Sequence, residues 1–148
     1  MRITVLGAGG SRRTELAIIR AARALGHECC LINVVGWNRY TGTFSSRIVR
    51  RLTDAFNPDF LILTRHAIEV GETTLRGLLR NRPSVLWYFD LEPKEKVVRL
   101  GRLVSKMYVT YFGQLETYKS AGVSRWPSGP PPPHTGIRAD RKPCGRTS

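Results

Sequence analysis

The glycine-rich segment near the N-terminus has the composition of a phosphate-binding loop. Residues 7–13 read Gly-Ala-Gly-Gly-Ser-Arg-Arg and directly follow a strand predicted over 2–6. Glycines let a backbone approach a phosphate, a following helix offers free N–H groups, and arginines add charge-assisted contacts. The alternative is a tight strand-to-helix turn without a ligand. The residues predicted to bind a ligand here are Gly7, Gly9, Gly10, Ser11 and Arg12.

The same segment departs from the dinucleotide-binding fingerprint. The pattern G-x-G-x-x-G starting at Gly7 requires glycine where Arg12 stands. The acidic residue expected at the end of the second apolar run is also missing, since that run ends near Asn33 and Val34. The sequence therefore disfavours an oxidoreductase that binds a nicotinamide or flavin cofactor.

A second segment, 35–44, carries side chains suited to a flat ring. Trp37 and Arg39 stand in it between glycines. Aromatic and guanidinium groups stack on sugars and bases, so both residues are predicted to bind ligand. The alternative is that Trp37 covers the edge of a sheet.

Two further segments offer acid–base chemistry. Arg65 can hold an anion, and the adjacent His66 can act as a general base near neutral pH. Asp90 comes right after the apolar run 85–89, a position that often binds ligand or catalyses in α/β proteins. The alternatives are an ordinary polar role for His66 and a helix cap for Asp90. His66 and Asp90 are thus the candidate catalytic residues, and Arg65 is a candidate ligand-binding residue.

Metal and cofactor chemistry has no sequence support. The chain has three cysteines, two of them adjacent, and no C-x2-C spacing. It contains neither a Walker-type phosphate loop nor a Ser-His-Asp spacing. We therefore predict no metal site and no bound cofactor.

These candidate residues follow apolar runs that alternate with amphipathic segments. Runs without internal alternation are typical of strands covered on both faces. The order predicts an α/β, Rossmann-like three-layer domain with a parallel sheet of about five strands and helices on both faces. Ligands bind such sheets at the carboxyl ends of the strands, where the candidate residues are expected to meet. Strands are predicted over 2–6, 29–35, 60–63, 85–89 and 107–112, and helices over 14–25, 45–56, 73–79, 93–104 and 114–121.

Composition limits the classes of protein to which the chain can belong. Of its 148 residues 41% are hydrophobic, which excludes wholesale disorder. It has no apolar run long enough to span a membrane, and its N-terminus lacks the layout of a secretory signal, so we expect a cytoplasmic protein. The net charge of +13 predicts an anionic partner, such as nucleic acid, membrane headgroups or a phosphorylated ligand. The alternative is an arginine-rich surface that only contacts solvent. Specific nucleic-acid binding is disfavoured because helix-turn-helix, zinc-finger and RRM signatures are missing.

The chain divides into two regions. Residues 1–124 are predicted to form the folded domain. Residues 125–148 hold six of the nine prolines and five basic groups against one acidic group, a net +4. A proline run favours extended backbone and cannot continue a helix or sheet. This tail is predicted to be disordered, or ordered only against a partner.

Several segments in residues 1–124 together resemble the N-terminal half of CgeB-like, spore-maturation-type glycosyltransferases of the GT-B architecture. The most specific part of the match is segment 85–90 in combination with segment 118–123. They are 1–7 (Met-Arg-Ile-Thr-Val-Leu-Gly), 24–28 (Ala-Leu-Gly-His-Glu), 57–63 (Asn-Pro-Asp-Phe-Leu-Ile-Leu), 85–90 (Val-Leu-Trp-Tyr-Phe-Asp) and 118–123 (Tyr-Lys-Ser-Ala-Gly-Val).

The resemblance implies sugar transfer from a nucleotide-sugar to an unknown acceptor, with this domain on the acceptor side of a cleft. In that family a second domain binds most of the donor, and its linking Leu-Pro-x-Gly-x-Asp-Pro-like stretch is replaced here by 126–130 and the tail. The resemblance thus implies an inactive isolated chain that a second domain or chain completes. The abrupt composition change near Trp126 raises the hypothesis of a shifted reading frame or a shortened gene. The alternative function is a non-catalytic Rossmann-like module that binds a nucleotide, another anionic ligand or nucleic acid.

Overall fold

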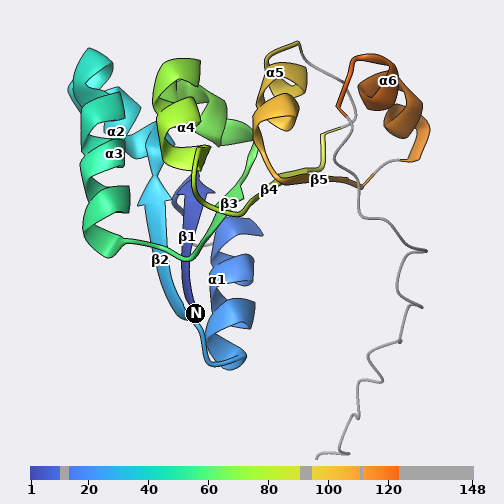
Figure 1. The fold of residues 1–148 in the computed structure, drawn as a ribbon. Coiled ribbons are helices and arrows are strands. Elements are labelled where there is room, and N and C mark those ends of the chain that lie inside the picture. The colour runs from blue at the N-terminus through green and yellow to red at the C-terminus, as the bar shows by residue number, and fades with distance from the viewer. Residues whose placement is uncertain (11–13, 91–94, 111, 124–148) are drawn as a thin grey trace, which may run out of the picture.

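The computed structural model describes residues 1–10, 14–90, 95–110 and 112–123 of the chain. Within these ranges it contains a five-stranded sheet in the order β2-β1-β3-β4-β5, and every strand pair is parallel (Figure 1). The predicted α/β Rossmann-like fold is confirmed. The predicted tail, 125–148, lies outside the described residues. The strands are β1 (Arg2–Gly7), β2 (Glu28–Asn33), β3 (Phe60–Leu63), β4 (Ser84–Tyr88) and β5 (Lys106–Val109).

Helices lie on both faces of the sheet, but unevenly. Among the described residues, one face packs on α1 alone, through a small core that includes Val5 and Ile19. The opposite face packs on α3, α4, α5 and α6 through a larger core, where Tyr88 meets Tyr118 edge-to-face with ring centroids 6.2 Å apart. The helices are α1 (Thr14–Ala24), α2 (Val34–Thr41), α3 (Ser45–Phe56), α4 (Glu72–Leu79), α5 (Glu95–Leu103) and α6 (Leu115–Ser120), and the 3-10 helices are η1 (Gly42–Phe44), η2 (Arg65–Val70) and η3 (Phe112–Gln114).

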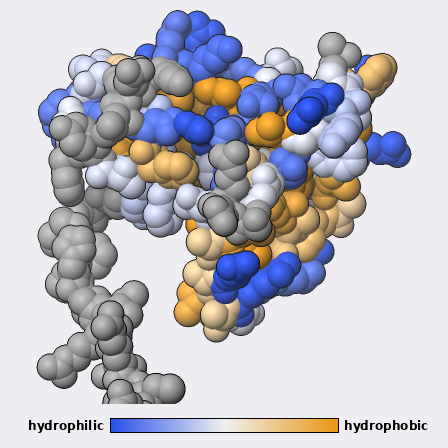
Figure 2. Space-filling view, turned by 180° about the vertical axis from the view of Figure 1, so that it is seen from behind, coloured by the Kyte–Doolittle hydropathy of each residue, from blue (hydrophilic) through white to orange (hydrophobic). Residues whose placement is uncertain are grey.

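In the part of the chain that the structure describes, α1 is the one helix on its side of the sheet, and it does not cover β4 and β5. Trp87 of β4 and Tyr108 of β5 are paired in the sheet and exposed on that side, with ring centroids 6.3 Å apart. Figure 2 views the molecule from behind and shows hydrophobic residues gathered over its lower part, where α1 lies.

Two segments predicted as loops are helical. Residues 34–41 form α2 directly after β2, where the sequence predicted a strand to 35 and a loop over 35–44. The reason is local, because the Asn33 side chain accepts a 3.0 Å hydrogen bond from the Gly36 N–H and caps the new helix. The predicted loop around His66 is the 3-10 helix η2.

Candidate functional site

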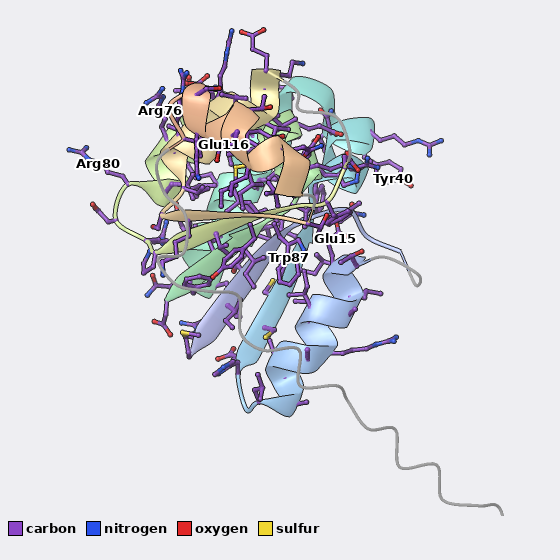
Figure 3. All side chains as sticks on the ribbon, turned by 90° about the vertical axis from the view of Figure 1, so that its right-hand side faces the viewer. Glu15, Tyr40, Arg76, Arg80, Trp87 and Glu116 are labelled. Atoms are coloured by element: carbon purple, nitrogen blue, oxygen red, sulfur yellow. The ribbon has the colours of Figure 1, made fainter. Side chains whose placement is uncertain are left out.

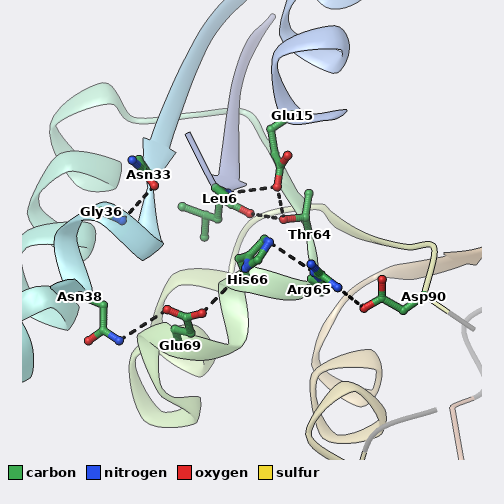
Figure 4. Close-up of polar contacts among 11 residues, drawn as sticks. Leu6, Glu15, Asn33, Gly36, Asn38, Thr64, Arg65, His66, Glu69 and Asp90 are labelled. Carbon is green, nitrogen blue, oxygen red and sulfur yellow. Dashed lines mark hydrogen bonds and ion pairs between the residues drawn. The ribbon is translucent and has the colours of Figure 1, made fainter. Parts of the chain in front are cut away.

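The strand order reverses between β1 and β3. The buried carboxylate of Glu15 lies at the carboxyl ends of these two strands. β1 lies between β2, the next strand in the chain, and β3, so the chain runs outward in opposite directions from here. Such a switch point is where open α/β sheets bind ligands. Glu15, 2% exposed at the start of α1, accepts hydrogen bonds from the Ala8 N–H (3.0 Å) and the Thr64 hydroxyl (2.9 Å) (Figure 4). One side chain thus joins the ends of β1 and β3 to α1.

The environment of Glu15 keeps it ionised. Burial raises the pKa of Glu15, but hydrogen bonds from its own backbone N–H, that of Ala8 and the Thr64 hydroxyl lower it, and nearby His66 lowers it further. The balance leaves the pKa of Glu15 below its ordinary value. The switch-point floor, by which we mean the buried Glu15 carboxylate between the ends of β1 and β3, therefore carries a negative charge.

The glycines of the first loop are explained by this packing. A Cβ at Gly7 would stand 2.5 Å from the Glu15 Cγ, and a Cβ at Gly9 would stand 2.6 Å from the Asn33 Nδ2. The Ala8 N–H is already donated to Glu15, so it is not free for a phosphate. Gly10 has a φ of 144°, a backbone conformation that glycine adopts readily. Ser11 and Arg12 lie outside the described residues, and their predicted ligand contacts stay predictions.

The structure brings Arg65, His66 and Asp90 together beside the switch point. Arg65 donates from Nη1 to the Asp90 carboxylate at 2.7 Å and from Nε to the His66 Nε2 at 3.3 Å (Figure 4). The hydrogen bond from Arg65 to Asp90 raises the pKa of Arg65. Gln114 donates to the Asp90 carbonyl at 3.0 Å, which fixes the end of β4 against η3. Arg65 thus links the carboxyl ends of β3 and β4.

Hydrogen bonding assigns a tautomer to His66. Because Nε2 accepts from Arg65, the neutral ring carries its proton on Nδ1. That atom lies 3.8 Å from Oε1 of Glu69, and the other oxygen of Glu69 accepts from Asn38 at 3.5 Å. In this arrangement the ring is an acceptor toward Arg65 and faces a carboxylate on its other side.

A hollow of about 360 Å³ opens beside these groups, which is within the usual size range of small-molecule sites. Positively charged side chains, carboxylates and an imidazole all line this hollow. Sequence reasoning missed Lys96, whose position on a helix facing the hollow follows only from the packing of α5. The side chains that line the hollow are Arg65, His66, Ile68, Glu69, Tyr88, Asp90, Lys96 and Val97.

Trp37 and Arg39 are not among the residues that line this hollow. Both lie on α2 and are exposed. Asn38 is the α2 residue that points toward the site, since it contacts Glu69 and Ser45. The structure therefore separates the predicted stacking residues from Arg65, His66 and Asp90.

Comparison with known proteins finds neither a family model nor a curated protein that matches this chain. The described residues include no helix that is long and apolar enough to cross a membrane. In the same part of the chain, no three His, Cys, Asp or Glu side chains come together in a way that could hold a metal ion.

Proposed function

We propose that this chain binds a phosphate-bearing sugar, a nucleotide-sugar or its phosphorylated acceptor, as the acceptor-side half of a glycosyltransferase. The observation that carries this proposal is the hollow at the carboxyl edge of the sheet, which combines Arg65 and Lys96 with the carboxylates of Glu69 and Asp90. We also propose a cytoplasmic location for the chain.

The lining suits a ligand that is both anionic and rich in hydroxyl groups. Arg65 uses Nη1 and Nε within the protein, which leaves further guanidinium N–H groups for a phosphate. Carboxylates accept hydrogen bonds from sugar hydroxyls, and Glu69 has a partly exposed side chain at the hollow. The buried charge of Glu15 disfavours a phosphate on the switch-point floor, so the phosphate is expected on the Arg65 and Lys96 side.

In sugar transfer, an acceptor oxygen bonds to the anomeric carbon as the nucleotide leaves, and a base takes the hydroxyl proton. We assign that base to His66, whose Nε2 would exchange the hydrogen bond that it accepts from Arg65 for the proton of the acceptor hydroxyl, and a positioning role to Asp90 through Arg65. A second domain or chain would have to hold the donor and exclude water. The isolated chain is expected to bind its ligand without transferring sugar.

One observation favours the alternative function, a non-catalytic module for an anionic ligand. Asp90 is tied to Arg65, His66 Nε2 already accepts a hydrogen bond, and the Ala8 N–H is occupied by Glu15. These contacts hold the side chains of a binding surface in place, but they also occupy groups that a reaction would use.

Arg65→Gln should weaken ligand binding about tenfold or more, because a charge-assisted hydrogen bond contributes roughly 1.5–3 kcal/mol. The measurement is a thermal-shift and calorimetric titration with UDP-, GDP- and ADP-sugars, sugar phosphates, NADP and an oligonucleotide at two salt concentrations. Arg50→Gln is the matched control, since Arg50 is exposed on α3 and pairs only with Asp54 in the described residues.

The outcomes separate the alternatives. Binding of a nucleotide-sugar or sugar phosphate that Arg65→Gln weakens and Arg50→Gln spares supports the proposed site. Transfer of sugar only after a donor-binding chain is added supports the enzyme, whereas binding without transfer in that mixture supports the non-catalytic module. Binding of the oligonucleotide alone, with steep salt dependence, would contradict both ligand proposals.

A further inference from the structure

A long stretch of the surface carries arginine and aromatic side chains without any acidic residue. Residues 29–53 contain four arginines and neither aspartate nor glutamate. After β2, this stretch continues through α2 and η1 into most of α3. The charge of this region is therefore entirely positive, although the chain as a whole has 11 acidic residues.

Large apolar side chains project into solvent from the same stretch. Tyr40 is 83% exposed and Phe44 is 60% exposed, and Trp37 and Leu52 are exposed as well. Trp37 and Tyr40 are three residues apart on α2, so they share one flank of the helix. Figure 3 shows Tyr40 pointing away from the body of the molecule. Exposed aromatic groups gathered in this way usually mark an interaction surface.

η1, which holds Phe44, and α3 follow α2 in the chain and pack against it. Ser45, Val49 and Thr53 are buried and define the core face of α3. Phe44, Ile48 and Leu52 are spaced four apart on one side of that face, and Arg47 and Arg51 accompany them. The other side carries Arg50 and Asp54, and Asp54 pairs with Arg82 at 3.2 Å.

Several other arginines of the surface form ion pairs, although Arg20 and Arg80, like the arginines of this stretch other than Arg50, form none among the described residues. Arg76 pairs with Glu72, and Arg99 pairs with Glu95. In the described part of the chain, Arg39, Arg47 and Arg51 form no ion pair, and Arg47 instead stands over the Phe44 ring at 5.7 Å from its centroid. We call this set the aromatic–arginine surface: Trp37, Arg39, Tyr40, Phe44, Arg47, Ile48, Arg51 and Leu52.

We infer that the aromatic–arginine surface binds an anionic lipid bilayer. Tryptophan and tyrosine rings favour the boundary between lipid headgroups and water, and apolar side chains such as Leu52 gain from burial among acyl chains. Unpaired arginines are attracted to an anionic leaflet. Nucleic acid is the less suitable partner, because the aliphatic flank of Ile48 and Leu52 offers nothing to a phosphate backbone.

Docking would place the hollow close to the lipid. Asn38 lies on α2 between the exposed aromatic residues and contacts Glu69 at the wall of the hollow. A ligand with a lipid tail could then reach the hollow from the bilayer. The lipid-binding inference itself does not depend on the proposed sugar ligand.

The test measures sedimentation of the full chain with phosphatidylcholine vesicles, with and without phosphatidylglycerol. The full chain should sediment with the anionic vesicles and much less with the neutral ones. Arg39→Gln/Arg47→Gln should weaken the apparent affinity about 25-fold, at about fivefold for each basic residue near an anionic surface. Trp37→Ala/Tyr40→Ala/Phe44→Ala should weaken it about tenfold or more, because three apolar contacts are lost.

Matched controls use exposed residues of the same types elsewhere. Arg76→Gln/Arg99→Gln removes two arginines and Tyr108→Ala removes an exposed aromatic ring, and both variants should bind as the parent does. Equal losses in these controls would overturn the inference, as would binding that ignores phosphatidylglycerol. An oligonucleotide that binds the parent but not the surface variants would overturn it in favour of nucleic acid.

Fluorescence gives a second readout that does not depend on affinity. Quenching by brominated lipid should fall in Trp37→Phe and persist in Trp87→Phe. The reverse result would place the lipid on the open face of the sheet and overturn the inference.

Discussion

Glu15→Ala should lower the free energy of unfolding by about 3 kcal/mol, one of the two largest effects we expect in this chain. The substitution removes the acceptor of two buried hydrogen bonds, from Ala8 N–H and the Thr64 hydroxyl. A buried donor left without a partner costs roughly 1–3 kcal/mol, and the vacated space adds a cavity term. Urea denaturation followed by circular dichroism measures the change.

Two variants test this explanation. Glu15→Gln keeps an oxygen that can accept both hydrogen bonds, so it should lose much less stability than Glu15→Ala. Glu116→Ala removes an exposed carboxylate of α6 that pairs only with Lys119 in the described residues, and should cost about 0.5 kcal/mol or less. Similar losses in Glu15→Ala and Glu116→Ala would mean that the switch-point carboxylate does not hold the loop.

The charge of Glu15 also predicts a pH dependence. Its pKa is lower in the folded chain than its ordinary value, so the unfolded state binds more protons in the interval between the two. The stability contributed by ionised Glu15 is therefore complete above about pH 4.5, near the ordinary pKa of glutamate, and is lost as the pH falls through the folded pKa. The difference in unfolding free energy between the parent and Glu15→Gln should be constant near neutrality and decrease below about pH 4.5. A difference that stays constant down to pH values of about 3 would contradict a lowered pKa.

The sequence predicted the sheet because its signals are local. The runs 60–63 and 85–89, which became β3 and most of β4, are apolar throughout, and the run that became β1 is apolar except for Arg2 and Thr4. Each run therefore indicated a strand without reference to the neighbouring strands. The helix α2 was missed although its signal was present, since asparagine is a favoured N-cap and Asn33 precedes Val34. Its glycines and aromatic residues are typical of loops and outweighed that signal.

The candidate site was predicted less completely because it depends on contacts between distant residues. The order of elements was enough to predict that Arg65, His66 and Asp90 meet at one edge, but not that Arg65 and Asp90 form an ion pair. Glu15 has the sequence position of an ordinary first-turn acid. Only the juxtaposition of β1 and β3 shows that its carboxylate occupies the loop predicted to hold phosphate.

The positions of the arginines in the structure show that the positive charge of the chain serves several different roles. Arg76 of α4 and Arg99 of α5 are balanced by Glu72 and Glu95, each one helical turn away. Arg65 is held by Asp90 at the hollow. Arg47 on α3 stands beside the exposed Phe44 ring, and Arg39 on α2 is exposed without an ion pair among the described residues. The net charge of +13 alone could not separate these three uses of arginine.

Gly7→Ala should be about as destabilising as Glu15→Ala, for the complementary reason. The new Cβ would stand 2.5 Å from the Glu15 Cγ and 2.7 Å from both the Glu15 Oε1 and the Thr64 Oγ1. Overpacking of this kind costs roughly 1–3 kcal/mol and sometimes more, because neighbouring side chains must leave their rotamers. Gly77→Ala is the matched control, since nothing lies within 4 Å of its Cβ and it stands inside α4. It should stabilise the chain by about 0.5–1 kcal/mol through helix propensity.

The double variant Gly7→Ala/Glu15→Ala identifies the cause. Without the Glu15 side chain, the Cβ at position 7 enters vacated space and meets only the Thr64 hydroxyl, which can rotate. The cost of Gly7→Ala should therefore fall by about 1 kcal/mol or more in the Glu15→Ala background, the coupling expected for residues in direct contact. Strictly additive losses would mean that glycine at position 7 serves something other than Glu15, and the phosphate-binding interpretation of this loop would then regain its support.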